Sequence, residues 1–243
     1  MSFFYPSFSD AVAHDSVIGT IRPDASDFEL VAPAGPVKNE LYPWPYISLA
    51  SPRWAPDGSA LFYHQVSGGV SAHAICRMLI PPEGKEQHCG PLVHPPIDVS
   101  ADNGRIAVTS WGQEVPGHWI GATGWDRIAG GFAPVRDLFR SDSRPFQSPA
   151  WAPTGATVAF YSGNSADQRQ VVVGDDVSSA FQTVIRVTDQ YKPDWAGTYP
   201  VLDWSPDGNW IAYEDAGAIW VTDAQGADEP SRIADGYSPS WRP

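Results

Sequence analysis

The chain has 243 residues, of which 42% are hydrophobic, and this is enough material for one sizeable all-β domain. Its net charge of −13 repels phosphate backbones, which excludes nucleic acid as a leading partner. No apolar run is long enough to cross a bilayer, so membrane insertion is excluded as well. The 22 Gly and 24 Pro favour many short strands joined by turns.

A strand–turn–strand pattern recurs along the chain, and each copy has one anchor residue just before a turn of the Pro-Asp-Gly kind. The copies at Ile21 and Val99 are weaker than those anchored by tryptophan. A spacing of 33 to 53 residues between anchors, with strand-rich content, is typical of a propeller or another repeat array. In chain order the anchors are Ile21, Trp54, Val99, Trp151, Trp204 and Trp241.

The copy anchored by Trp204 has the clearest turn chemistry. Pro206 presets the first corner, Asp207 can bond back to the chain, and Gly208 supplies the positive φ that the turn needs. In the copy anchored by Trp151, a threonine replaces the aspartate. Short antiparallel strands are predicted for the Trp204 repeat at 200–205, 210–214, 218–222 and 231–234.

These repeats resemble the blades of TolB-type β-propellers. The resemblance rests on Pro-x-Trp-Ser/Ala-Pro-Asp-Gly followed by an apolar Ile-Ala-Tyr/Phe strand. The stretch Trp220-Val-Thr-Asp-Ala-Gln-Gly226 is also similar to the third strand and turn of such blades. The resemblance covers most of residues 20–243 and implies an all-β propeller of four-stranded antiparallel blades.

We expect one domain spanning 1–243 with five blades, or six if residues 3–18 form part of a degenerate blade. Segment 237–243 looks like the first strand of a further blade and is expected to close the ring. Closure leaves few unpaired strand edges, which favours a monomer. The expected repeats are approximately 20–50, 51–96, 97–147, 148–199 and 200–236.

Cys76 and Cys89 flank the turn Pro81-Pro82-Glu83-Gly84. In a symmetric hairpin they face each other closely enough to form a disulfide, whereas two packed, reduced cysteines are the alternative. A disulfide favours a periplasmic or extracellular protein, although the N-terminus lacks the pattern of a signal peptide. His73 and His88 lie close to these cysteines in sequence. Residues one or three apart on a strand point to opposite faces, so neither a metal site nor a cofactor is expected.

No catalytic motif is found in the sequence. There is no Gly-x-Ser-x-Gly elbow and no phosphate-binding Gly-x-x-x-x-Gly-Lys loop. Most of the acidic residues fall in turns, which explains them better than a pair of glycosidase carboxylates does. A non-enzymatic protein is therefore favoured, with a glycan-active enzyme or the propeller fragment of a larger enzyme as an alternative.

The segments that lead into each first strand are expected to rim one end of a central channel, the default binding site of this architecture. Arg53, Asp98 and Asp203 each precede an anchor and so hold equivalent places. The alternative is that such residues only satisfy loop hydrogen bonds. The predicted ligand-binding residues at this rim are Tyr46, Arg53, His94, Asp98, Phe146, Tyr199, Asp203 and Tyr237.

Three further tryptophans, Trp111, Trp119 and Trp125, lie in a Gly-rich stretch away from the anchors. On an exposed loop they could stack on a sugar or hold a peptide; the alternative is that Trp119 and Trp125 fill strands of an irregular blade. As the leading hypothesis, the resemblance implies binding of a protein or peptide at the channel mouth, because TolB-type propellers bind cell-envelope partners in that way. A carbohydrate-binding module that uses these tryptophans for a glycan is the second hypothesis.

Overall fold

The computed structural model contains β-strands and no helix among the residues that it describes. The chain divides into two compact units, the first made of Met1–Pro95 with Asp126–Phe132, the second of Pro96–Trp125 with Ala133–Pro243. The described residues are 2–6, 16–20, 29–32, 47–67, 73–79, 87–102, 104–111, 118–126, 131–141, 146–163, 170–175, 181–186 and 200–241.

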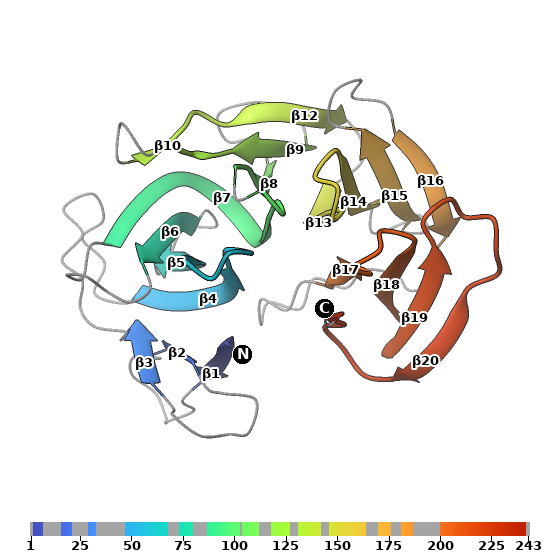
Figure 1. Cartoon of the computed structure of the whole chain (residues 1–243), viewed down its shortest axis with the longest axis horizontal. Helices are drawn as coiled ribbons and strands as arrows, with labels where there is room; N and C mark the ends of the chain where they lie inside the picture. The colour runs from blue at the N-terminus through green and yellow to red at the C-terminus, as the bar shows by residue number, and fades with distance from the viewer. Residues whose placement is uncertain are drawn as a thin grey trace. The chain divides into compact units, whose positions relative to one another are not determined.

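The first unit contains a three-stranded antiparallel sheet followed by the strand series β4 to β7 (Figure 1). The three-stranded sheet consists of β1 (Ser2–Pro6), β2 (Ser16–Thr20) and β3 (Glu29–Ala32). The next strands pair in chain order and are β4 (Ile47–Trp54), β5 (Ala60–Ser67), β6 (His73–Leu79) and β7 (Gln87–Val99). A short ribbon pairs β10 (Trp125–Asp126) with β11 (Gly131–Phe132).

The second unit contains one end of a seven-stranded sheet and, after it in the chain, two four-stranded sheets. The end of β7 is hydrogen-bonded to β8 (Ile106–Trp111), which continues through β9 (His118–Thr123) to β12 (Arg136–Ser141). The next sheet has the order β13 (Phe146–Trp151), β14 (Thr157–Ser162), β15 (Gln170–Asp175) and β16 (Phe181–Arg186). The last has the order β17 (Leu202–Trp204), β18 (Trp210–Asp215), β19 (Ala218–Asp223) and β20 (Ser231–Asp235), which confirms the four strands predicted there.

The middle sheet of the second unit is buried on both faces. Val158 and Phe160 of β14 belong to one apolar cluster with residues of β8, β9 and β12, whereas Ala159 and Tyr161 belong to another with residues of β17 and β18. Because side chains alternate along a strand, a doubly buried strand reads as a continuous apolar run, as residues 158–161 do.

Consecutive repeats contact each other at three places, which we call the first, second and third junctions. The first junction joins the sheet of β7, β8, β9 and β12 to the sheet β13–β16, and the second joins β13–β16 to β17–β20. The third joins β17–β20 to segment 237–241, through hydrogen bonds from that segment. Figure 1 shows β13 and β17 next to each other, with β16 and β20 on the far sides of their sheets.

Candidate functional site

Three turns of one geometry, and a fourth that has the same closing hydrogen bond, define equivalent positions in the repeats. Gly58, Gly155 and Gly208 each adopt a φ of 72°, the left-handed conformation that glycine tolerates best. In each turn the N–H directly after the anchor donates to the carbonyl five residues further on. These bonds are Ala55 N to Ala60 O at 2.9 Å, Ser100 N to Arg105 O at 2.8 Å, Ala152 N to Thr157 O at 2.8 Å and Ser205 N to Trp210 O at 2.9 Å.

The aspartates of these turns accept hydrogen bonds within their own turn. Asp207 Oδ1 accepts the Ser205 hydroxyl at 2.5 Å and the Asn209 N–H at 3.0 Å. These bonds, that of Ser205 foremost, hold the pKa of the Asp207 carboxyl below its usual value. Asp102 accepts the Ser100 hydroxyl at 2.5 Å, and this bond is the main cause that lowers its pKa. Both carboxylates therefore serve turn structure.

Asp98 and Asp203, which are predicted to bind a ligand at the rim, each accept a hydrogen bond from the following anchor. Asp98 Oδ2 accepts the backbone N–H of Trp151 at 2.7 Å, across the first junction. Asp203 Oδ2 accepts the backbone N–H of Trp241 at 2.8 Å, across the third junction. Both carboxylates are partly buried and link one repeat to the next, which agrees with the alternative that such residues satisfy hydrogen bonds.

The second junction is held by different groups. Here the residue before the anchor is Ala150, which has no carboxylate, and its carbonyl accepts the indole N–H of Trp204 at 3.0 Å. The backbone N–H of Trp204 donates to Asp203 Oδ1 at 3.0 Å. The Tyr161 hydroxyl accepts the N–H of Glu214 at 2.9 Å and lies 3.2 Å from the carbonyl oxygen of the same residue.

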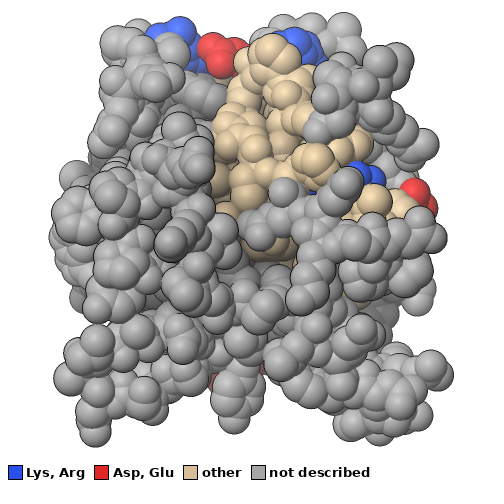
Figure 2. All heavy atoms as spheres, turned by 90° about the vertical axis from the view of Figure 1, so that its left-hand side faces the viewer, with Lys and Arg blue, Asp and Glu red and all other residues tan. Residues whose placement is uncertain are grey.

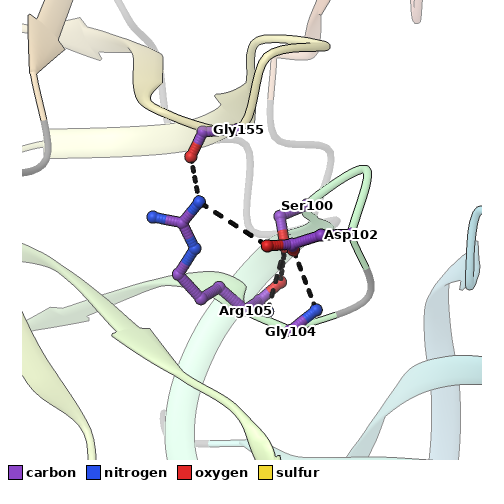
Figure 3. A network of polar contacts seen from close by, with 5 residues as sticks. All are labelled: Ser100, Asp102, Gly104, Arg105 and Gly155. Atoms are coloured by element: carbon purple, nitrogen blue, oxygen red, sulfur yellow. Dashed lines mark hydrogen bonds and ion pairs between the residues drawn. The ribbon is translucent and has the colours of Figure 1, made fainter.

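Arg105 connects the turns on the two sides of the first junction (Figure 3). Its guanidinium donates to the carbonyl of Gly155 and lies 4.5 Å from the centre of the Trp151 ring. It also forms an ion pair with Asp102 at 4.0 Å. This partly buried arginine contacts a carbonyl, an aromatic face and a carboxylate, and so it links neighbouring repeats.

The serine three residues before the anchor has a left-handed backbone conformation that was not predicted from the sequence. Ser51, Ser148 and Ser238 have φ of 51°, 52° and 54°, in the left-handed region. All three are followed by proline and stand in a Ser-Pro-x-Trp order, which is the sequence signal that could have revealed them. Glu214 Oε1 accepts the N–H of Ser238, so this conformation also takes part in the third junction.

The other described rim candidates differ in exposure. Phe146 is buried at 1% exposure and packs against Phe160 with ring centres 4.9 Å apart, so its side chain serves the core here. Arg53 and Trp125 are partly buried. Tyr237 is 74% exposed, and a Cβ placed on Gly217 would lie 3.5 Å from its hydroxyl. Tyr237 is therefore the rim candidate most accessible to a partner among the described residues.

The remaining candidates are described in part or not at all. Trp111 and Trp119 lie in strands β8 and β9, and Trp125 begins β10. His94 lies within β7, and its side chain lies outside the described part of the structure. Tyr46 and Tyr199 lie outside the described residues. Ligand binding by any of these residues stays a prediction.

The first unit contains a disulfide between Cys76 and Cys89. The two residues are direct partners in the register of β6 and β7, with Cα atoms 4.1 Å apart. Cys76 is fully buried, whereas Cys89 is exposed, and Gln65 Oε1 lies 3.3 and 3.2 Å from the two sulfur atoms. The bond joins adjacent strands of one hairpin.

Charged groups do not gather into an evident site on the described surface. Within the described ranges, no group of three or more His, Cys, Asp or Glu is placed to hold a metal ion. On the face drawn in Figure 2, the described atoms are mostly uncharged, with a few basic and acidic side chains at the edges. In this part of the chain there is no helix long and apolar enough to span a membrane.

No protein-family model matches the sequence. No curated protein matches it either. Solved structures do resemble it, including TolB from Acinetobacter baumannii, with a TM-score of 0.61 and 12% identity over 90% of this chain and 49% of TolB. A chain of the nidogen/laminin complex matches with a TM-score of 0.62 and 10% identity, over 97% of this chain and 79% of that one. A prolyl endopeptidase matches with a TM-score of 0.59 and 12% identity, over 97% of this chain and 35% of the endopeptidase chain.

These neighbours and the antiparallel four-stranded sheets establish a β-propeller fold. The chain spans about half of the length of the TolB chain that it resembles. At such identities the similarity defines the fold alone, because propellers carry many unrelated functions. The TolB-type repeat, the five blades, the closed ring and the single domain stay predictions.

Proposed function

We propose that this β-propeller is a non-enzymatic binding protein, whose protein or peptide partner contacts the rim of the second unit at Tyr237. The rim is the end of the sheets at which β13 and β17 begin. The observation that carries the proposal is the 74% exposure of Tyr237 in the segment that leads to the last anchor. A large exposed aromatic side chain on a rigid scaffold is a typical binding hot spot.

The backbone around Tyr237 is well fixed, which supports a role as a preorganised contact. The preceding Gly236 N–H donates to the carbonyl of Gly217 at 3.0 Å. The following Ser238 N–H donates to the carboxylate of Glu214. With both neighbours bound to the sheet, little backbone entropy is lost when a partner binds at this position.

The charge of the chain favours a partner with net positive charge. The chain carries a net charge of −13. Opposite charge speeds the encounter of two proteins, and the rate falls as salt screens it. Binding is therefore expected to weaken as the salt concentration rises.

The experiment selects peptides from a random display library on the immobilised protein and titrates the selected peptides against Tyr237→Ala. We expect this variant to weaken binding at least tenfold, the loss typical of a hot-spot residue. Ile233→Ala is the matched control, because Ile233 is 62% exposed but lies on the outer strand β20. Selected peptides that bind Tyr237→Ala as tightly as the unchanged protein would contradict the proposal.

We also propose that the protein works in the periplasm or outside the cell, and the Cys76–Cys89 disulfide supports this location. The test alkylates the thiols in intact cells that make the protein naturally, under acid quenching, and analyses the peptides by mass spectrometry. We expect both cysteines to be protected from alkylation until a reductant is added. Free thiols in the native cells would contradict an exported location.

A further inference from the structure

Two buried hydroxyl groups at the first junction have no hydrogen-bond partner in the part of the chain that the structure describes. They are Thr109 Oγ1 on β8 and Ser148 Oγ on β13. Thr109 is 1% exposed and Ser148 is 2% exposed, so bulk water does not reach them. Buried polar groups normally bind to protein or to an ordered water molecule, and an unsatisfied one destabilises the fold.

The equivalent positions at the other two junctions are linked directly. Tyr161 and Glu214 each lie ten residues after an anchor, and each reaches the residue three positions before the next anchor. The Tyr161 hydroxyl lies 3.4 Å from the carbonyl of Val201, across the second junction. Glu214 Oε1 accepts the N–H of Ser238, across the third junction. A polar link at this place is thus a recurring feature of the repeats.

At the first junction, Thr109 and Ser148 occupy these two equivalent positions. Thr109 lies ten residues after Val99, and Ser148 lies three residues before Trp151. Their strands β8 and β13 are in contact. The threonine side chain is shorter than that of tyrosine or glutamate, and the Thr109 hydroxyl makes no hydrogen bond to the described residues.

We propose that one ordered water molecule is bound between Thr109 and Ser148 and replaces the direct link of the other junctions. Each hydroxyl can both donate and accept, so together they supply the two or more hydrogen bonds that a buried water requires. Both ligands are neutral, which favours water over a metal cation or an anion. The site is independent of the Tyr237 rim contact.

Urea unfolding, followed by tryptophan fluorescence, tests the proposal with Thr109→Val, Ser148→Ala and the double variant. A bridging water makes each hydroxyl a satisfied group, so each single variant should raise the unfolding constant about fivefold. The double variant should raise it by clearly less than the product of the two, because both changes remove the same water. A crystal structure at high resolution should show the water within hydrogen-bond distance of both oxygens.

Thr123→Val is the matched control. Thr123 is 3% exposed, lies on β9 and donates directly to the carbonyl of Ala133 at 2.6 Å, so its replacement should also raise the unfolding constant. Single variants at Thr109 and Ser148 that are neutral or stabilising, beside a destabilising Thr123→Val, would overturn the proposal. So would two destabilising effects that multiply fully in the double variant, since they would indicate two separate contacts.

Discussion

The first and second junctions of the second unit have the same architecture but different chemistry. At the first, the Asp98 carboxylate accepts the Trp151 backbone N–H, and Arg105 bridges the two turns. At the second, the later anchor again donates, but the donor is the indole N–H of Trp204 and the acceptor is the backbone carbonyl of Ala150. The repeat therefore specifies the place of a cross-link more strictly than the residue that makes it. Either solution satisfies backbone groups that two packed sheets would otherwise bury.

The largest expected loss of stability comes from a substitution at the second junction. Trp204→Ala should lower the free energy of unfolding by about 3–5 kcal/mol, because Trp204 is only 6% exposed and a cavity would remain. Trp210→Ala is the control, since Trp210 is 39% exposed, and its loss should be clearly smaller. Urea unfolding gives both values. Similar losses for the two variants would contradict the scaffold role of the anchor.

The next largest loss of stability is expected when the hydrogen bonds of the Asp98 and Asp203 carboxylates are removed. Asp98→Ala and Asp203→Ala should each cost about 1–3 kcal/mol, because the N–H of Trp151 or Trp241 loses its acceptor. Asp98→Asn keeps an acceptor oxygen and should cost less. Asp137→Ala serves as a control, because its ion pair with Arg140 at 3.9 Å is exposed and worth about 0–1 kcal/mol. An Asp98→Ala variant as stable as Asp137→Ala would show that the link contributes nothing.

A smaller change sharpens the comparison at the second junction. Tyr161→Phe removes only the hydroxyl that accepts the Glu214 N–H, and we expect a loss of about 1–2 kcal/mol in thermal or urea unfolding. Tyr237→Phe removes a hydroxyl from an exposed side chain and should leave stability unchanged. If Tyr161→Phe also leaves stability unchanged, the prediction is wrong, and the ring of Tyr161 stabilises the junction through its apolar contacts alone.

The smallest effect concerns acid. The pKa values of Asp102 and Asp207 are lowered in the folded state, so the stability they contribute is present above their unfolded pKa of about 3.9. It is lost as the pH falls through the folded pKa values. Asp207→Asn should flatten the decline of stability below about pH 4, and Ser205→Ala should flatten it as well, because it removes the hydrogen bond that contributes most to the lowered pKa of Asp207. Unfolding curves recorded at pH 5 to about pH 2 test this; an unchanged slope in both variants would contradict it.

The turns were predictable from sequence because their chemistry is local. Pro206, Asp207 and Gly208 determine the corner by φ preference and by bonds to residues two positions away. The hairpin symmetry that placed Cys76 opposite Cys89 is local in the same way. Such features need only neighbours in the chain, which a single sequence displays in full.

The roles of Asp98 and Asp203 were not predictable, because their partners lie 53 and 38 residues further along the chain. The sequence showed that the two positions are equivalent, but equivalence alone does not separate a ligand contact from a structural link. The link became evident only when strand packing brought the next anchor within 3 Å. The left-handed serine before proline was visible as a motif, yet its φ depends on the bulge that β13 forms against β14.

The disulfide of the first unit has a consequence for how the chain survives cleavage. Cys76 and Cys89 bracket the segment that connects β6 with β7. A protease that cuts one peptide bond between them leaves two polypeptides that remain covalently joined, with the β6–β7 pairing still tethered. Such a nicked molecule migrates as two fragments on a reducing gel and as one band without reductant.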